Sequence, residues 1–522
     1  MSNSEKKTKL YFNQKSRVDN SLKSSVVSVV CNVANIIFGL LYRTIFVYVL
    51  GAAYLGINGL FTSVLSVLSL AELGITTAIV YRLYKPISMN DPYKVGQIMC
   101  FFKWVYRAIA FIVLLAGLAI VPVLPFLIKD GTEIPGDINI YVIYCLFLLQ
   151  SASTYMFSYR LSILNADQRG YTFSVVQLSI TLAGYIVQAT VLIIFQDFTL
   201  ALTSAVVTNL LVNFILSRWV TAQYPEVFSV KDILEKKERK EIYSDVYATA
   251  CHQFGFVALN ATDNIVLSSF VGIVATGMYS NYYLVTSSLT TLVSKMLGSF
   301  VGSLGNAHVL LSDEENYLVF RRLVFANFSL TSLFTICTFI LIDDFISLWL
   351  GPDLLLDKLA VIAQCVYFFL ALNRIINGVF INSFGLFVKD KIRPLIEALV
   401  NVFVSIALVQ IIGISGVFFG TALSFLVTIF WREPYLLHKH VFKNSMKNYW
   451  IRYAQFALLT FVLCFFDTTI KGIVGFELSW FSLIIEGLVC ASVFVLFLVL
   501  LFFRTAEYRF YKELLATRIF HR

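Results

Sequence analysis

Apolar runs of about 20 residues follow one another along almost the whole chain, from Ser21 to Phe503. A bilayer core is roughly 30 Å thick, so a helix needs about 20 apolar residues to cross it. Backbone groups in lipid must be satisfied within the segment, and runs of this length do not fit the strands of a membrane barrel, which are about ten residues long. The pattern therefore predicts an all-α, polytopic membrane protein.

Short polar breaks divide these runs into about fourteen predicted transmembrane helices. Their ranges are 22–49, 57–84, 97–127, 139–163, 171–196, 198–220, 243–270, 274–303, 317–349, 357–385, 392–412, 414–436, 449–467 and 480–503. Composition agrees, because 58% of the 522 residues are hydrophobic and only 14% are charged. Such values are typical of membrane proteins and exclude most soluble enzymes.

Basic residues alternate between the breaks, and this predicts an orientation. Only Lys129, Lys358 and Lys471 fall in or beside breaks on one side, and five other basic residues lie within spans. The remaining 32 of the 40 Lys and Arg residues lie on the opposite side or at the helix ends facing it. The side rich in Lys and Arg is normally cytoplasmic, so we expect both termini in the cytoplasm. The same sorting accounts for the net charge of +9, and we expect no nucleic-acid partner.

The sequence predicts neither a cleavable signal nor a metal or cofactor site. Residues 1–20 are polar, and the first apolar run lacks a small-residue cleavage site. All eight cysteines lie within predicted spans without a CxxC pair, so we interpret them as packing residues. His438 and His440 are two residues apart, which is wrong for one helix face, and the sequence contains no phosphate-binding P-loop.

Two pairs of turns indicate an internal repeat. The predicted outer turns 51–56 and 272–277 both begin and end with glycine and are 221 residues apart. The turn 165–170 precedes the fifth span, as 388–393 precedes the eleventh. Two matches in the same order and on the same sides favour a parallel repeat of six helices, which places a cavity between the halves.

A charged stretch at 230–241 follows the sixth span, and we interpret it as a solvated segment that divides the chain. The predicted parts are an N-terminal lobe (1–222), a cytoplasmic linker (223–242), a C-terminal lobe (243–440), and the last two helices with a cytoplasmic tail (441–522).

Several motifs resemble one family of bacterial transporters. They are LGAAYLGINGLF at 50–61, LSLAELG at 68–74, YKP at 84–86, TDNIV at 262–266 and GMYSNY at 277–282. With the fourteen-helix count, they make the whole chain similar to Wzx-type flippases of O-antigen, capsule or exopolysaccharide repeat units. These flippases form the polysaccharide transporter family within the multidrug/oligosaccharidyl-lipid/polysaccharide exporter superfamily.

The resemblance implies a MATE-like architecture, with two six-helix lobes in a V and two further helices at the C-terminus. It implies a cargo of undecaprenyl-pyrophosphate-linked oligosaccharide, moved from the cytoplasmic to the outer leaflet by alternating access. The place would be the bacterial cytoplasmic (inner) membrane, and the pathway would be synthesis of lipopolysaccharide, capsule or exopolysaccharide. Such a carrier is not an enzyme and needs no cofactor; its partners are the lipid-linked glycan, membrane lipid and a coupling ion.

Basic side chains inside spans are costly, so each is a candidate site residue. They are Arg43, Lys103, Arg107, Lys295 and Arg374. The resemblance places Arg43 near a basic cavity position of related lipid flippases, where its planar fork would bind pyrophosphate; the alternative is snorkelling to the outer headgroups. Lys103 and Arg107 are four apart and share a helix face, with Arg107 deeper. Together the five predict a positively charged cavity for the pyrophosphate and glycan.

Two acids also lie deep within predicted spans, Glu72 in the second and Asp263 in the seventh. The repeat offset places Asp263 within one residue of the position that matches Arg43. Each acid is a candidate for an ion pair between the lobes or for binding a coupling proton or sodium ion, and the alternative is a buried structural pair with an arginine. Other acids lie closer to helix ends, and we expect those to be solvated; among them are Asp343, Asp344, Glu397 and Glu486.

Three other functions compete with this interpretation. A multidrug exporter and a peptidoglycan-precursor exporter would share the fold, although intramembrane basic residues disfavour cationic drugs. A membrane glycan polymerase, from another functional class, usually carries a sizeable outer loop with catalytic residues. The predicted outer breaks here are short, which favours a transporter.

Overall fold

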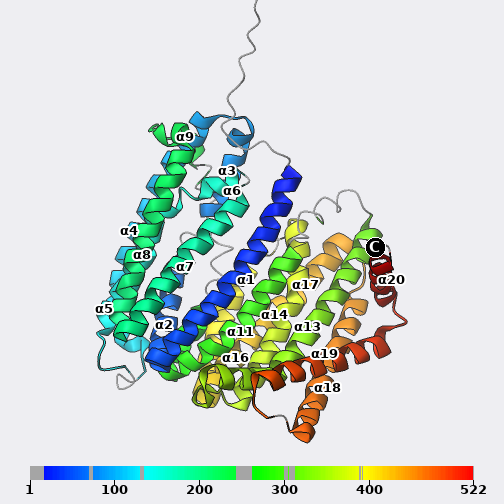
Figure 1. Ribbon diagram of the computed structural model, residues 1–522. Coiled ribbons are helices and arrows are strands. Elements are labelled where there is room, and N and C mark those ends of the chain that lie inside the picture. Colours follow the sequence, from blue (N-terminus) through cyan, green and yellow to red (C-terminus); the bar gives the residue numbers. More distant parts are fainter. Residues whose placement is uncertain are drawn as a thin grey trace, which may run out of the picture. The chain divides into compact units, whose positions relative to one another are not determined.

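The computed structural model describes residues 17–69, 75–129, 134–167, 169–240, 242, 261–298, 304, 312–386, 390, 392–475 and 477–520 (Figure 1). The regular elements in these ranges are helices, with no strand, which confirms the all-α prediction. Eleven of the helical stretches are long and apolar enough to cross a membrane. The chain is therefore a polytopic membrane protein, as its apolar runs predict.

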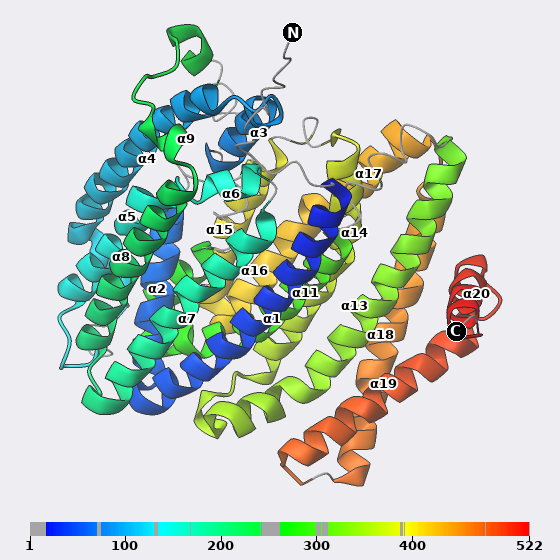
Figure 2. The same cartoon turned by 45° about the horizontal axis from the view of Figure 1, so that its top comes forward.

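The chain divides into two compact units, Met1–Gly277 and Met278–Arg522. The helices of the first unit are α1 (Arg17–Leu50), α2 (Ala52–Leu68), α3 (Ile75–Ser88), α4 (Pro92–Ile120), the 3-10 helix η2 (Val121–Leu127), α5 (Ile140–Ser158), α6 (Ser162–Ala166), α7 (Gly170–Phe195), α8 (Phe198–Gln223) and α9 (Pro225–Ser229). Residues 261–270 are also helical. Helix α1 packs along α7, α7 on α8, α8 on α5 and α5 on α4 (Figure 2).

A buried ion pair fixes the corner between α6 and α7. Asp167 is almost fully buried, and its carboxylate lies 3.1 Å from Nε of Arg169. The hydroxyl of Tyr224, directly after α8, donates a hydrogen bond of 2.6 Å to the same carboxylate. Burial, together with the charge of Asp167, raises the pKa of Tyr224. The second unit has a similar pair at 388–393, where Nε of Arg393 lies 2.5 Å from Asp390, so both turns of the predicted repeat contain a buried Asp–Arg pair.

Helices α2 and α11 (Ile273–Gly298) both start directly after a glycine of the predicted repeat. Gly51 has φ of 91° and Gly272 has φ of 138°, conformations that glycine adopts at little cost and L-residues rarely adopt. The two glycines thus have the same structural role, which supports the repeat.

The first turns of α2 and α11 cross with almost no space between their backbones. A Cβ atom on Gly56 would lie 1.9 Å from the carbonyl oxygen of Ile273, and one on Gly277 would lie 2.3 Å from that of Ala52. With an offset of 221 residues, Ala52 matches Ile273 and Gly56 matches Gly277. The contact is therefore reciprocal, since each glycine packs on the first residue of the other helix. The first compact unit ends at Gly277 and so includes this turn, which packs on α2.

The second unit is built around α13 (Asp313–Leu350), which starts at a capping box formed by Ser312 and Glu315. The other elements after α11 are η4 (Pro352–Leu354), α14 (Lys358–Ser383), α15 (Arg393–Ile412), α16 (Ile414–Val427), α17 (Ile429–Leu437), the π-helical turn η6 (His438–Phe442), α18 (Lys447–Val474), α19 (Trp480–Phe502) and α20 (Ala506–Phe520). Helix α13 packs against α14, α18 and α19. Its aromatic core includes Phe320 and Phe328, which contact Tyr449 of α18.

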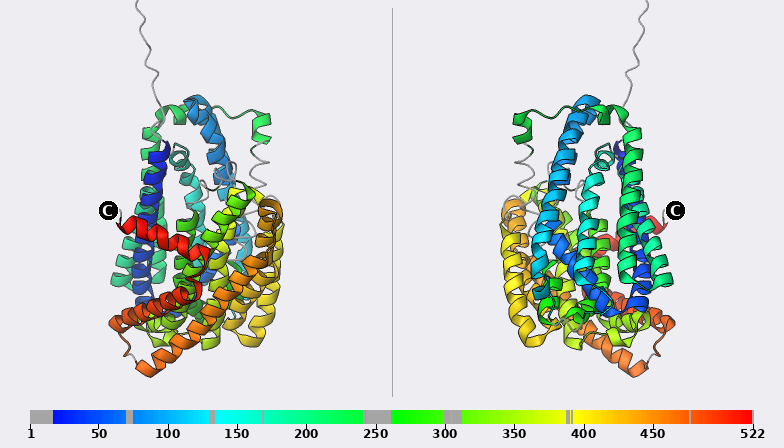
Figure 3. Two further views of the ribbon diagram at one scale, coloured as in Figure 1. Left: turned by 90° about the vertical axis from the view of Figure 1, so that its right-hand side faces the viewer. Right: turned by 90° about the vertical axis from the view of Figure 1, so that its left-hand side faces the viewer.

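The predicted cytoplasmic tail contains a docked helix. Helix α20 follows α19 after a sharp turn (Figure 3). Its Glu507 is buried and pairs with Arg321 of α13, while the other carboxylate oxygen lies 3.4 Å from Arg452 of α18. A cavity of about 240 Å³ lies beside these three charges. The polar face of α20 is therefore anchored by one carboxylate shared between two arginines.

We expect Glu507→Ala to loosen α20 and lower the free energy of unfolding by about 1–3 kcal/mol, because two partly buried guanidinium groups lose their acceptor. Thermal unfolding in detergent measures the loss, and limited proteolysis shows whether α20 is released. Lys512→Ala, at an exposed position of the same helix, is the control. Equal melting temperatures for Glu507→Ala and the unaltered protein would contradict this role.

Candidate functional site

Arg43 lies in the last part of α1, seven residues before Leu50, which places it about 10 Å from the helix end at 1.5 Å per residue. Its side chain is half-buried, and its Nη2 atom is inaccessible. The adjacent Tyr42 stacks on Tyr185 of α7 with ring centres 5.0 Å apart and donates a 2.9 Å hydrogen bond to Gln188. The contact between α1 and α7 thus gathers aromatic and polar groups at the residue of α1 that precedes Arg43.

Lys103 and Arg107 lie on α4, in a different environment. Lys103 is half-buried, whereas Arg107 is exposed on the helix face that also exposes Trp104 and Phe111. Exposed apolar side chains at membrane depth are typical of a face in contact with lipid tails. Helix α4 packs mainly on α3, α5 and α9, and α1 packs on α2 and α7, so Arg43 and Arg107 stand on helices with different neighbours.

Arg374 of α14 is paired with an acid that the sequence analysis did not single out. Its Nη2 and Nε atoms lie 3.0 and 3.1 Å from Oε1 of Glu433 on α17, whose side chain is 3% exposed. The charge of Arg374 is therefore balanced within the second unit.

The start of α15 extends this charged group into a network. Arg393 pairs with both Asp390 and Glu397, and Nε of Arg432 lies 3.4 Å from Asp390. With Arg374 and Glu433, the network holds three arginines and three carboxylates, so its formal charge is zero. The expectation that Glu397 is solvated is wrong, because its side chain is buried and bound to Arg393.

Glu433→Ala is expected to destabilise the protein by about 3 kcal/mol, since removing one partner of a buried pair leaves an uncompensated charge. The double variant Arg374→Met/Glu433→Leu should recover most of this loss, because both charges leave together. Thermal unfolding in detergent measures both effects, with Glu477→Ala as an exposed control. Similar losses in the single and double variants would contradict the pairing.

The remaining predicted residues are spread over the chain. Lys295 is exposed near the C-terminus of α11. Asp263 is 6% exposed, and its neighbour Asn264 donates a hydrogen bond of 2.9 Å to Ser63 of α2. Glu72 lies outside the described residues. The roles of these residues in cargo or ion binding stay predictions.

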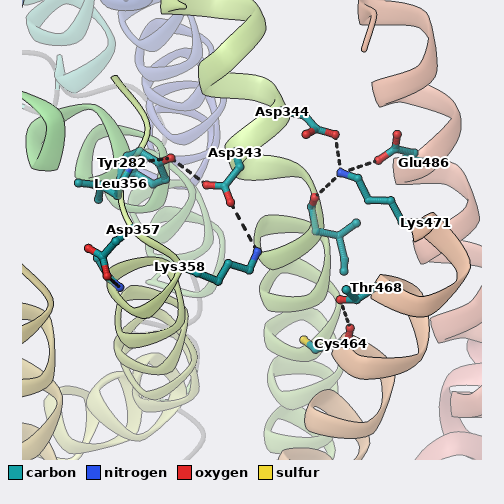
Figure 4. A network of polar contacts seen from close by, with 12 residues as sticks. Tyr282, Asp343, Asp344, Leu356, Asp357, Lys358, Cys464, Thr468, Lys471 and Glu486 are labelled. Atoms are coloured by element: carbon teal, nitrogen blue, oxygen red, sulfur yellow. Dashed lines mark hydrogen bonds and ion pairs between the residues drawn. The ribbon is translucent and has the colours of Figure 1, made fainter. Parts of the chain in front are cut away.

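A second polar group of the second unit joins α11, α13 and α14 (Figure 4). The buried hydroxyl of Tyr282 donates a hydrogen bond of 2.8 Å to Asp343, and Nζ of Lys358 lies 3.5 Å from the other oxygen of that carboxylate. The backbone N–H of Leu356 donates to the Tyr282 hydroxyl at 3.3 Å. These contacts tie the end of α13 to α11 and to the start of α14.

The next residue of α13 points to the C-terminal helices (Figure 4). Nζ of Lys471 on α18 pairs with Asp344 and lies 3.1 Å from Glu486 of α19 and 3.0 Å from the carbonyl oxygen of Ile340. Glu486 is 4% exposed, so the expectation that it is solvated is also wrong. Sequence position indicated that these acids lie near helix ends, but could not reveal their partners.

Comparison with solved structures identifies the fold. The chain is similar to an inward-facing multidrug resistance MATE family transporter of the MOP superfamily, with a TM-score of 0.60 and 14% identity over 80% of this chain and 99% of that one. It is also similar to the lipid II flippase MurJ in an inward closed conformation, with a TM-score of 0.66 and 14% identity over 94% of this chain and 100% of that one. No protein-family model matches the sequence, and no curated protein matches it significantly. The chain thus has the MATE-like fold that the resemblance implies.

Proposed function

We propose that this protein is a flippase that moves undecaprenyl-pyrophosphate-linked oligosaccharide repeat units from the cytoplasmic to the outer leaflet of the bacterial inner membrane. Alternating access of two six-helix lobes would carry the polar head through the protein while the prenyl chain stays in lipid. Both termini would lie in the cytoplasm, as the distribution of Lys and Arg predicts. Surface polysaccharide synthesis would consume the product.

The observation that carries this proposal is the extent of the structural likeness. The MurJ structure covers 94% of this chain and the MATE structure 80%, a difference of about 73 of the 522 residues. The larger share of this chain that the MurJ structure covers favours a lipid flippase over a drug exporter, and the sequence motifs favour an oligosaccharide cargo.

Arg43 is the residue to which we assign the pyrophosphate. A guanidinium offers five donors in a planar fork that suits phosphate oxygens, and its charge favours an anion at membrane depth. A negative-inside membrane potential would assist outward movement of an anion by about 2.3 kcal/mol per charge for each 100 mV. The roles of Lys103, Arg107 and Lys295 along the path are part of the same proposal, whereas Arg374 is already paired with Glu433.

A second candidate is a peptidoglycan-precursor flippase, because the MurJ structure is named for lipid II and matches over nearly the whole chain. Deleting the gene in its natural host separates the candidates. We expect lipid-linked oligosaccharide to accumulate in the inner leaflet, surface glycan to disappear, and growth and drug sensitivity to stay normal. Arrest of cell-wall synthesis, rescued by a known lipid II flippase, would instead favour the second candidate, and increased drug sensitivity alone would favour a multidrug exporter.

A further inference from the structure

The junction between the end of α13, the end of α18 and the start of α19 holds more negative than positive charge. Lys471 is held between Asp344 and Glu486 (Figure 4), so these three side chains together have a formal charge of −1 when all are ionised. Each of the three helices is apolar and long enough to cross a membrane. The single positive charge of Lys471 therefore cannot also neutralise another carboxylate at this junction.

A further carboxylate is present one helical turn away. Asp467 precedes Lys471 by four residues on α18 and is 3% exposed. Both of its oxygens are inaccessible, and neither accepts a hydrogen bond of normal geometry. The thiol of Cys490 on α19, a weak donor, interacts with this carboxyl group.

An ionised carboxylate in such surroundings is very costly. Burial without a compensating cation or strong hydrogen bonds disfavours the charged form, and a group of this kind normally takes up a proton instead. The ionisable groups that interact with Asp467 are the thiols of Cys337 on α13, Cys464 on α18 and Cys490 on α19. Lys471 follows Asp467 by four residues on α18 and binds Asp344 and Glu486. This cation is therefore already held by two acids.

We propose that this junction is a proton-binding site, with Asp467 as the proton carrier and the group of Lys471, Asp344 and Glu486 as its link to water. Asp467 lies seven residues before Val474, about 10 Å from the end of α18, so a proton from the nearby interface has a short path. Sodium is the disfavoured occupant, because the position of a cation between Asp344 and Glu486 is already taken by Lys471.

This site deepens the proposed function, because it names the proton as the coupling ion. The coupling role rests on the flippase proposal, whereas proton binding by Asp467 does not. Asp344 is adjacent to Asp343, which binds Tyr282 of α11 and Lys358 of α14. Loss of the proton would add a second uncompensated negative charge between α13, α18 and α19. The change would thus act on the helix that links the C-terminal pair to α11 and α14.

Infrared spectroscopy of the purified full chain tests proton binding without any glycan. We expect a carbonyl band of a protonated carboxyl group at neutral pH, its disappearance at alkaline pH, and its loss in Asp467→Asn. The exposed Asp353→Asn is the control that should keep the band. A band that persists in Asp467→Asn, or its absence from the unaltered protein, would overturn the proposal. A response to sodium at constant pH in place of the pH response would also overturn it.

Transport in proteoliposomes tests the coupling role. With one proton per cycle, a gradient of one pH unit should shift the steady-state distribution of the lipid-linked glycan by up to about tenfold. Asp467→Asn should still move glycan but ignore the gradient. A distribution in the unaltered protein that ignores the gradient would overturn coupling. No movement of glycan under any condition would contradict the proposed function and leave the infrared result unaffected.

Discussion

Arg43→Ala should reduce translocation of the lipid-linked glycan about 10- to 100-fold while the protein remains in the membrane in normal amount. Hydrogen bonds to charged groups contribute about 1.5–3 kcal/mol each, and every 1.4 kcal/mol is a factor of ten. The position of Arg43, half-buried at membrane depth beside Tyr42, suits contact with an anion rather than with bulk water. Surface glycan and membrane content of the tagged protein, measured in one culture, give the two quantities.

Three further variants make this prediction specific. Arg43→Lys keeps the charge but not the planar fork, and we expect intermediate export. Arg107→Ala should cause a smaller loss, because Arg107 is exposed beside Trp104 and Phe111. Arg504→Ala changes an exposed arginine after α19 and should export normally. Normal export from Arg43→Ala would remove the residue from the transport path.

Gly277→Leu should remove most of the transport activity and lower the stability of the first unit. A Cβ on Gly277 would lie 2.3 Å from the carbonyl oxygen of Ala52, so α11 would have to move away from α2. Overpacking usually costs about 1–3 kcal/mol, and we expect the upper end because the obstacle is backbone rather than a movable side chain. Gly56→Leu should behave alike, since a Cβ there would lie 1.9 Å from the carbonyl oxygen of Ile273.

The control for this crossing is a glycine with space around it. A Cβ on Gly472, in α18, would have no neighbour within 4 Å, so Gly472→Ala should leave both stability and transport unchanged. Thermal unfolding in detergent and glycan export are measured on all three variants. Normal stability and export in Gly277→Leu would show that α2 and α11 do not need this close approach.

The sequence was sufficient to predict the helices because hydropathy reports directly on membrane spans. For example, the spans predicted at 357–385 and 480–503 correspond to α14 (Lys358–Ser383) and α19 (Trp480–Phe502). The ends differ by at most two residues. One predicted span is interrupted, however. The twelfth covers α16 and α17, which are separated by Thr428. Hydropathy averages over such interruptions and does not detect them.

The polar helix α20 could not be predicted in the same way. It lacks an apolar run, and its docking depends on Glu507 meeting Arg321, which is 186 residues earlier in the chain. A pairing over that distance has no local signal in the sequence. The tail was therefore expected only to be cytoplasmic.

For charged side chains, the sequence indicates a position within an apolar run but not the partner in an ion pair. The position of Arg374 within an apolar run predicts membrane depth, but its pairing with Glu433 depends on how α14 meets α17. Glu397 and Glu486 lie near helix ends and are nevertheless buried. Asp467 could have been singled out from the sequence. It is an acid within the apolar run LCFFDTT at 463–469, and an ionisable residue in such a run is a candidate functional residue.

Reconstitution with a defined lipid-linked substrate tests the central claim most directly. The purified protein is placed in proteoliposomes with undecaprenyl-pyrophosphate oligosaccharide, and an added enzyme that cannot cross the membrane cleaves the glycan exposed outside. We predict that the unaltered protein makes the internal pool accessible and that Arg43→Ala does so about 10- to 100-fold more slowly. An internal pool that stays protected with the unaltered protein, in vesicles where a known flippase exposes its own substrate, would contradict the account.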